Sequence, residues 1–110
     1  MDKMNENLAK KIQELQIIEQ TVQSLMIQRQ TFQLELNEML SAIEELESAK
    51  DEVYKIVGQI MIKSKKETLE KDLREKKSLL EMRVKSIEKQ EDSLKEKLEK
   101  LREEVMKEIR

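Results

Sequence analysis

The 110-residue chain lacks cysteine, histidine, proline and tryptophan, and it contains a single glycine, Gly58. Without cysteine or histidine it has no disulfide, no thiol or imidazole catalyst and no ordinary zinc site. A phosphate cradle at a helix start needs several glycines, so a nucleotide-hydrolysing loop is excluded too. Carboxylates are abundant, but nothing sets two of them in a dry pocket that would separate their pKa values. The sequence therefore predicts a protein that is not an enzyme and that binds no metal and no other cofactor.

Long apolar runs are also missing. No run approaches the roughly 20 residues that cross a bilayer, and the N-terminal sequence Met-Asp-Lys-Met-Asn-Glu lacks the apolar core of a secretory signal. The formal net charge is −2 and aromatic residues make up 2% of the chain, so neither a basic field nor stacking side chains favour nucleic acid. We expect a cytoplasmic protein with no membrane partner and no nucleic-acid partner.

Helix-forming residues dominate what is present. Charged residues make up 42% of the chain, and almost nothing interrupts helix formation. From about Asn5 to Ala49, apolar residues recur alternately three and four positions apart, which predicts a first coiled-coil helix. Arg29 interrupts one apolar row and Lys11 interrupts the other. The two rows are Leu8, Leu15, Val22, Leu36 and Ile43, and Ile18, Leu25, Phe32, Met39 and Leu46.

A second helix is predicted after Ser64, because Ser64 and Glu67 have the spacing of a capping box. Its strict heptad row is Leu73, Leu80, Ile87, Leu94 and Leu101. If the chain folds back at Gly58, the two helices pair in antiparallel orientation and Arg29 faces Ile87. The predicted fold is mainly α, a long antiparallel two-helix coiled coil with one β-hairpin at the helix junction. We expect one unit over residues 1–110, divided into a first helix (1–49), a hairpin oligomerisation segment (50–65) and a second helix (66–110).

Residues 53–63 are the stretch whose pattern is not helical. Short β-branched runs on either side of Gly58 predict two strands and a turn, with the even-numbered side chains from Tyr54 to Ile62 tending towards one face. A lone hairpin is marginal in water and exposes unpaired backbone edges, so we expect strands from other chains to complete its sheet. The alternative is a simple helix–helix connection, although such connections are usually shorter and more polar. The predicted oligomerisation residues are Val53, Tyr54, Ile56, Val57, Gly58, Ile60, Met61 and Ile62.

The two free helix ends carry apolar side chains that could either close the helical seam or remain exposed. Flexible, polarizable methionine side chains at such ends suit promiscuous binding. Several ends that point the same way would form a multivalent apolar surface. The candidate client-binding residues are Met1, Met4, Leu8, Ile12, Leu101, Val105, Met106 and Ile109.

A basic region follows the predicted hairpin, from Lys63 to Lys77. Acidic residues interrupt it, so its simplest interpretation is a solvated helix start. The functional alternative is a docking patch for an acidic protein partner.

The hairpin sequence resembles that of a known family. Val53-Tyr54-Lys55-x-Val57-Gly58, followed by Ile60-Met61-Ile62-Lys63, is similar to the hairpin of prefoldin β subunits. Gln-Leu-Glu-Leu-Asn-Glu at 33–38 and the Glu-x-Arg…Glu-Lys-Gln-Glu pattern of 81–91 also resemble that family. Prefoldin α subunits carry two hairpins and this chain has room for one, so it resembles a β subunit of the archaeal type.

This resemblance implies a chaperone function. It implies an ATP-independent holdase subunit that binds unfolded proteins at coiled-coil tips and delivers them to a group II chaperonin. The implied partners are a prefoldin α-type subunit and other β subunits, in a hetero-oligomer of α2β4 composition whose hairpins form a β-barrel platform. The alternative is a structural coiled-coil scaffold or adaptor without client binding.

Overall fold

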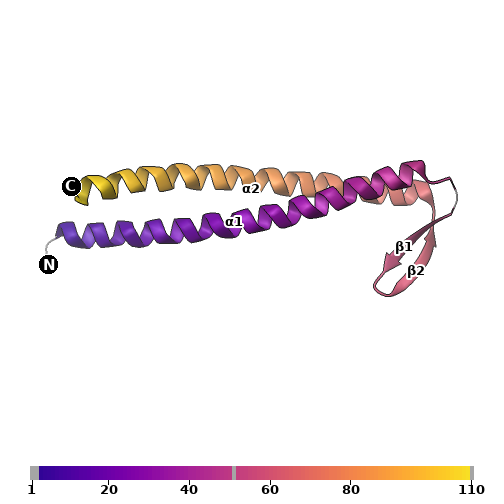
Figure 1. Cartoon of the computed structure of the whole chain (residues 1–110), viewed down its shortest axis with the longest axis horizontal. Coiled ribbons are helices and arrows are strands. Elements are labelled where there is room, and N and C mark those ends of the chain that lie inside the picture. The colour runs from indigo at the N-terminus through magenta and orange to yellow at the C-terminus, as the bar shows by residue number, and fades with distance from the viewer. Residues whose placement is uncertain (1–2, 51, 110) are drawn as a thin grey trace. The chain divides into compact units, whose positions relative to one another are not determined.

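The computed structural model describes residues 3–50 and 52–109, with side chains described from Asn5 onward. The elements in chain order are α1 (Lys3–Ser48), β1 (Val53–Val57), β2 (Ile60–Ser64) and α2 (Lys66–Ile109) (Figure 1). The prediction of a mainly helical chain with one hairpin between two long helices is therefore confirmed. The barrel expected from the hairpins of several chains stays a prediction.

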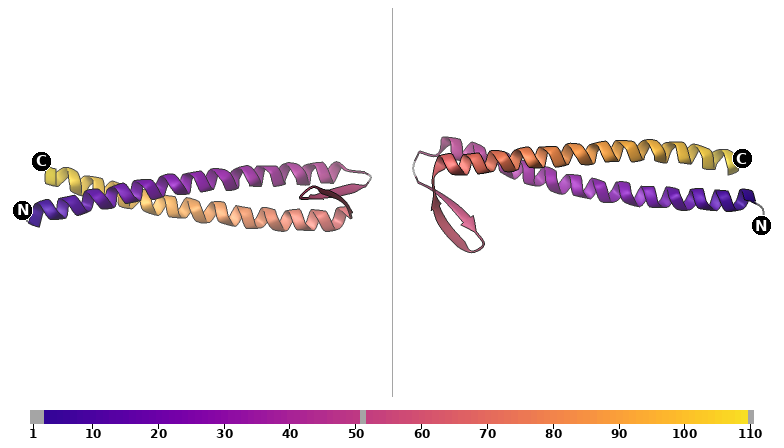
Figure 2. Two further views of the ribbon diagram at one scale, coloured as in Figure 1. Left: turned by 90° about the horizontal axis from the view of Figure 1, so that it is seen from below. Right: turned by 180° about the vertical axis from the view of Figure 1, so that it is seen from behind.

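The chain divides into two compact units. The terminal unit comprises Met1–Gln30 and Lys85–Arg110, and the hairpin unit comprises Thr31–Val84. Within each unit, a segment of α1 lies beside a segment of α2 that runs in the opposite direction (Figure 2). Each helix can therefore bury only the stripe that faces its partner.

The buried side chains follow the predicted heptad rows. In the terminal unit, Leu15 and Leu94 pack against a buried cluster of Ile18, Val22, Leu98 and Leu101. The buried aliphatic side chains of the hairpin unit are Leu36, Ile43, Leu46, Leu80 and Val84. Among the described residues no side chain is completely buried, because a pair of helices has no further layer to cover the seam.

In the terminal unit, the pairing of α1 with α2 lies within about one turn of the predicted register. Arg29, expected opposite Ile87, instead contacts Glu91 in the terminal unit. The reason is that side chains on a helix lean towards its N-terminus. In antiparallel helices the two leans are opposite, so side chains that touch start from backbone positions that are not level with each other.

The residue that caps the start of α2 differs from the prediction, although α2 itself begins at Lys66. Ser64 is the last residue of β2, where it pairs with Val53. The Lys65 carbonyl accepts the first helical hydrogen bond, from the Leu69 N–H at 3.0 Å. Lys65 therefore occupies the N-cap position. The capping box predicted for Ser64 and Glu67 is wrong, because the strand ladder holds Ser64 in extended conformation.

The hairpin is a two-stranded antiparallel sheet closed by Gly58 and Gln59. Gly58 has a φ of 61°, in the left-handed region that favours glycine. A positive φ at only the first turn position fits a type II′ turn, which matches the twist of the strands. A methyl group at Gly58 would meet no atom within 4 Å, so the backbone angle rather than space requires glycine.

The two-residue turn changes which side chains share a face. Ile56 pairs with Met61, and Val57 pairs with Ile60. Because directly paired residues point to the same side of a sheet, Ile60 lies on the face opposite Ile56. The predicted face of even-numbered side chains is therefore wrong, since a two-residue turn pairs even positions with odd ones.

Candidate functional site

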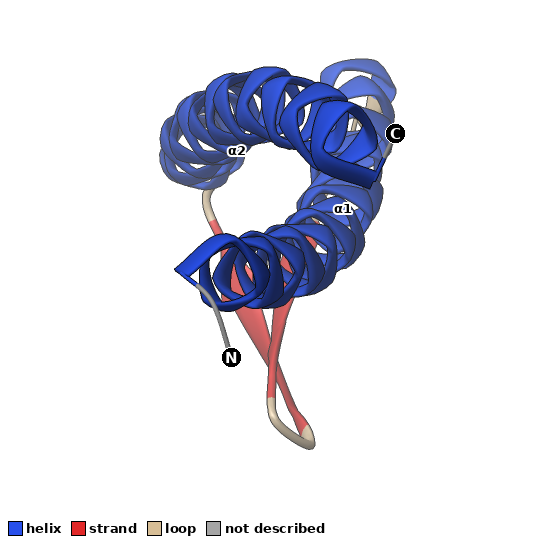
Figure 3. Ribbon diagram, turned by 90° about the vertical axis from the view of Figure 1, so that its left-hand side faces the viewer, coloured by secondary structure: helices blue, strands red, loops and turns tan. Residues whose placement is uncertain are grey.

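The hairpin exposes aliphatic side chains on both faces. On one face Ile56 is 70% exposed and its cross-strand partner Met61 is 65% exposed. On the other face Ile60 is 65% exposed, beside the half-exposed Val57. Figure 3 shows the two strands extending away from the neighbouring helices, which explains this exposure. A patch of this kind on a short sheet is typical of a surface that another chain covers.

The sheet also has two free edges, because β1 and β2 pair only with each other in the described structure. Unpaired N–H and C=O groups along such edges are a template for strand addition. All eight predicted oligomerisation residues lie in this hairpin: Val53, Tyr54, Ile56, Val57, Gly58, Ile60, Met61 and Ile62. Their role in assembly stays a prediction.

A groove of about 760 Å³ lies between the base of the hairpin and the helices of the hairpin unit. Its apolar lining includes Leu46, Val53, Leu69, Leu73 and Leu79. Sequence reasoning missed this groove, because it depends on the direction in which the hairpin leaves the helices. The available signal in the sequence was Leu79, an apolar residue outside the heptad rows of α2, and the structure shows it exposed.

A carboxylate joins the two strands at their base. Glu52 accepts hydrogen bonds from the Tyr54 hydroxyl at 2.6 Å and from Lys63 Nζ at 2.7 Å. The bond from Lys63, and then that from Tyr54, lowers the pKa of Glu52 below its usual range. The same carboxylate raises the pKa of Tyr54. Because Tyr54 and Lys63 are cross-strand partners, Glu52 links β1 to β2 at this pair.

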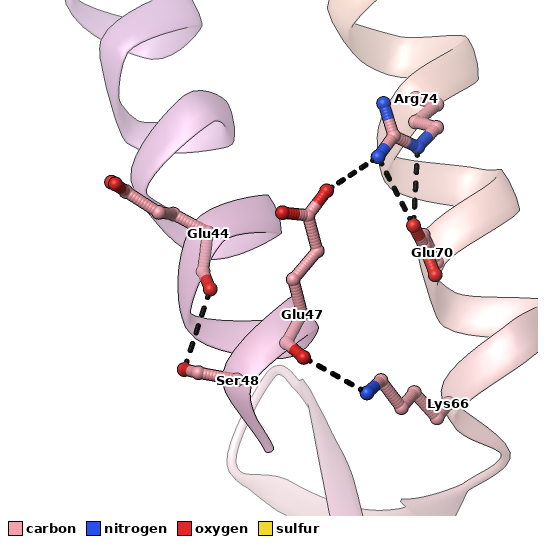
Figure 4. Close-up of polar contacts among 6 residues, drawn as sticks. All are labelled: Glu44, Glu47, Ser48, Lys66, Glu70 and Arg74. Atoms are coloured by element: carbon pink, nitrogen blue, oxygen red, sulfur yellow. Dashed lines mark hydrogen bonds and ion pairs between the residues drawn. The ribbon is translucent and has the colours of Figure 1, made fainter.

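The basic region beside the hairpin is largely engaged within the hairpin unit. Lys66 Nζ donates to the carbonyl oxygens of Glu47 at 3.1 Å and Ala49 at 3.0 Å, at the end of α1. Arg74 bridges Glu47 at 2.6 Å and Glu70 at 3.1 Å (Figure 4). Cations near a helix C-terminus compensate its exposed carbonyl groups. These contacts favour the interpretation of a structural helix start over that of a docking patch.

The structure separates the predicted client-binding residues into groups. Met1 and the side chain of Met4 lie outside the described part of the chain. Leu8 is half-buried, whereas Leu101 and Val105 are buried in the seam of the terminal unit. The exposed members are Ile12, Met106 and Ile109, at 38%, 53% and 63%. Their role in client binding stays a prediction.

Sequence reasoning missed the polar part of the terminal-unit seam. Glu91 is buried, and Arg29 Nε lies 2.6 Å from Glu91 Oε1. The signal was present in the sequence, because Arg29 interrupts an apolar row of the first helix. Glu91 likewise interrupts the row of the second helix that contains Val84, Leu98 and Val105. Among the described residues, no three or more acidic side chains are grouped so as to hold a metal ion.

The fold places the chain in a class of proteins: antiparallel coiled coils in which an exposed apolar hairpin is inserted between the two helices. A family model described as "Prefoldin subunit" matches residues 4–110. The prefoldin β subunit of Archaeoglobus fulgidus is 40% identical over 94 residues, which cover 84% of this chain and 78% of that protein. The β subunit of Thermococcus kodakarensis is 37% identical over 99 residues, 88% of this chain and 85% of that protein.

A solved structure agrees with these relatives. The crystal structure of the prefoldin β subunit from Thermococcus strain KS-1 matches with a TM-score of 0.89 and 33% identity, covering all of this chain and 98% of that one. The chain belongs to the prefoldin family. The resemblance that the hairpin motif indicates is therefore confirmed.

Family membership makes the chain one subunit of a multi-subunit chaperone, in a family not known for enzymes. In the part of the chain that the structure describes, neither helix combines the length and the apolar character that crossing a bilayer demands. The stoichiometry, the clients and the delivery of clients to a chaperonin stay predictions.

Proposed function

We propose that this chain is the β-type subunit of a cytoplasmic, ATP-independent holdase. Its hairpin joins an α-type subunit and other β-type subunits in an α2β4 hexamer, and its free helix ends bind unfolded proteins for delivery to a group II chaperonin. The observation that carries the proposal is the hairpin with exposed aliphatic side chains on both faces and two free edges.

The energetics of the hairpin favour a closed assembly over a simple pair. Burial of an exposed Ile, Val or Met side chain contributes roughly 1.5–3 kcal/mol. Six hairpin side chains are 47–70% exposed, so their full burial contributes roughly 5–10 kcal/mol per subunit. Association costs an estimated ~4–15 kcal/mol. One hairpin–hairpin contact is therefore weak, and a ring in which each hairpin uses both faces and both edges is stable.

Client capture follows from the exposed apolar side chains of the terminal unit. Ile12, Met106 and Ile109 offer a small apolar area, which makes each contact weak and reversible. Several chains acting together multiply the effective concentration of such contacts. Many weak contacts that act together explain how clients could be bound tightly and still be released without ATP.

The test compares apolar-to-acidic substitutions at the helix ends with a matched change elsewhere. Met106→Glu with Ile109→Glu is expected to preserve assembly and to abolish most suppression of client aggregation, measured by light scattering after dilution of a chemically unfolded protein. Met82→Glu is the control, because Met82 is also an exposed α2 methionine, at 68%, but belongs to the hairpin unit. Truncation of residues 1–8 and 103–110 should give the same loss.

Two outcomes would contradict the proposal. An assembly that never suppresses aggregation would indicate a structural scaffold or adaptor instead. Equal losses in Met82→Glu and in the helix-end variants would show that the helix ends are not the client-binding site.

A further inference from the structure

Two charged layers interrupt the apolar seam of the terminal unit. Arg29 Nε lies 2.6 Å from Glu91 Oε1, and the Glu91 side chain is only 5% exposed. Glu91 is the one charged residue buried among those that the structure describes. Lys95 Nζ lies 3.9 Å from the other Glu91 oxygen. Arg29 stands in the same heptad row as Val22, where an aliphatic side chain would otherwise be expected.

The second layer repeats this arrangement nearer the chain ends. Lys11, which interrupts the heptad row of Ile18, donates to Glu108 and lies 3.7 Å from Glu104. The hydrogen bond to Glu108 raises the pKa of Lys11. The other Glu108 oxygen is buried and has no hydrogen-bond partner within the described structure. In both layers α1 supplies the cation and α2 supplies the anion.

Stability alone does not account for the Arg29–Glu91 layer, in which the carboxylate is buried. Replacing a buried ion pair with apolar residues of similar size is often neutral or stabilising, whereas removing one partner is strongly destabilising. Polar residues at coiled-coil core positions are best known for setting register and partner choice. The layers are therefore better explained by the helix pairings that they disfavour.

The apolar rows alone specify the register poorly, because they repeat every seven residues. Val22 and Leu98 belong to one buried cluster. Arg29 lies seven positions after Val22, and its partner Glu91 lies seven positions before Leu98. A slip of one heptad in one direction would place Glu91 opposite Val22. A slip in the other direction would place Arg29 opposite Leu98. Either slip leaves a charge buried against an aliphatic side chain.

We propose that the Arg29–Glu91 and Lys11–Glu108 layers determine helix pairing: they select α1 with α2 in the observed register and reject slipped pairings. They also reject parallel, in-register pairing of α1 with α1 of a second copy, which would bring cation against cation in both layers. Parallel pairing of α2 with α2 would likewise bring carboxylate against carboxylate. In a complex of several such chains, these layers disfavour contacts between the α1 helices, or between the α2 helices, of neighbouring subunits.

The absence of native cysteine allows a direct test by disulfide trapping. Val22→Cys with Leu98→Cys reports the observed register, and Val22→Cys with Val105→Cys reports a slip of one heptad. With the native charged layers, the slipped reporter is expected to form at least about tenfold less intramolecular disulfide than the native reporter. Val22→Cys alone reports α1–α1 contacts between copies and should yield almost no disulfide-linked dimer.

Removing the layers is expected to relax this selection. When Lys11→Leu, Arg29→Leu, Glu91→Leu and Glu108→Leu are combined, the slipped or intermolecular disulfide should rise at least about fivefold while helix content by circular dichroism is kept. The matched control combines Lys10→Leu, Glu14→Leu, Lys97→Leu and Glu99→Leu, all at exposed positions, and it should leave the disulfide pattern unchanged. An unchanged pattern in the layer variant, or an equal rise in the control, would overturn the proposal.

A charge exchange decides the question if the four-leucine variant fails to fold. Arg29→Glu alone should reduce the native disulfide, and Arg29→Glu with Glu91→Arg should restore it. No restoration would refute the proposal. Because these experiments measure register and not chaperone activity, their failure would leave the proposed function standing, and failure of that function would not alter their outcome.

Discussion

Removal of the Arg29 guanidinium is the sharpest perturbation of stability that the structure suggests. In Arg29→Met the Glu91 carboxylate stays buried and loses its partner at 2.6 Å. Breaking a buried pair in this way costs about 3–5 kcal/mol. Lys95, at 3.9 Å from Glu91, still compensates part of the charge, so we expect a loss near the lower limit, about 3 kcal/mol.

Thermal and urea unfolding, followed by circular dichroism at one protein concentration, measure this loss. For a chain of this size, 3 kcal/mol corresponds to a fall in Tm of about 10–15 °C. The double variant Arg29→Met with Glu91→Leu should regain this loss and unfold within about 1 kcal/mol of the native chain, or above it. Arg102→Met is the control, because the Arg102–Glu19 pair is exposed, and it should lose less than about 1 kcal/mol.

Two results would refute the reasoning. A loss below about 1 kcal/mol in Arg29→Met would mean that Glu91 does not need its partner. A double variant as unstable as the single variant would mean that the loss of stability comes from removing the attraction between Arg29 and Glu91, and not from leaving the carboxylate unpaired.

Three further predictions concern the hairpin unit and the chain ends. Ile60→Glu should dissociate the oligomer while helix content is kept, as size-exclusion chromatography with light scattering would measure. Gln59→Glu, in the turn, should leave the oligomer intact. An intact Ile60→Glu oligomer would exclude the hairpin from assembly. Lys66→Met should lose about 1–3 kcal/mol and accelerate amide hydrogen exchange at the end of α1, and equal acceleration in Lys71→Met would contradict this. Glu108 raises the pKa of Lys11. The stability that this pair contributes should therefore persist below the ordinary lysine pKa of about 10.4 and fall as the pH rises above it. A Lys11→Met variant whose alkaline unfolding curve matches that of the native chain would disprove the contribution of the pair.

Heptad spacing made most of the fold predictable. Rows such as that of Ile18 and Leu25 are buried as expected, because a repeat of three and four residues can bury only one stripe. The register was harder to predict, since side chains that lean in opposite directions shift the contact of Arg29 from Ile87 to Glu91. Counting positions along the sequence does not include that lean.

The candidate site was predictable in location but less so in detail. The β-branched runs around Gly58 located the hairpin, but the pairing of Val57 with Ile60 depends on a turn length that the sequence left open. At the chain ends, the candidate client-binding residues Leu101 and Val105 also belong to the heptad rows, and they are buried because these rows continue almost to the end of α2.

Native mass spectrometry of the chain, alone and mixed with a prefoldin α-type subunit, tests the central claim most directly. The account predicts a hexamer of two α-type chains and four copies of this chain, which Ile60→Glu disrupts. A stable monomer in both samples, with the hairpin unpaired at micromolar concentration, would contradict it.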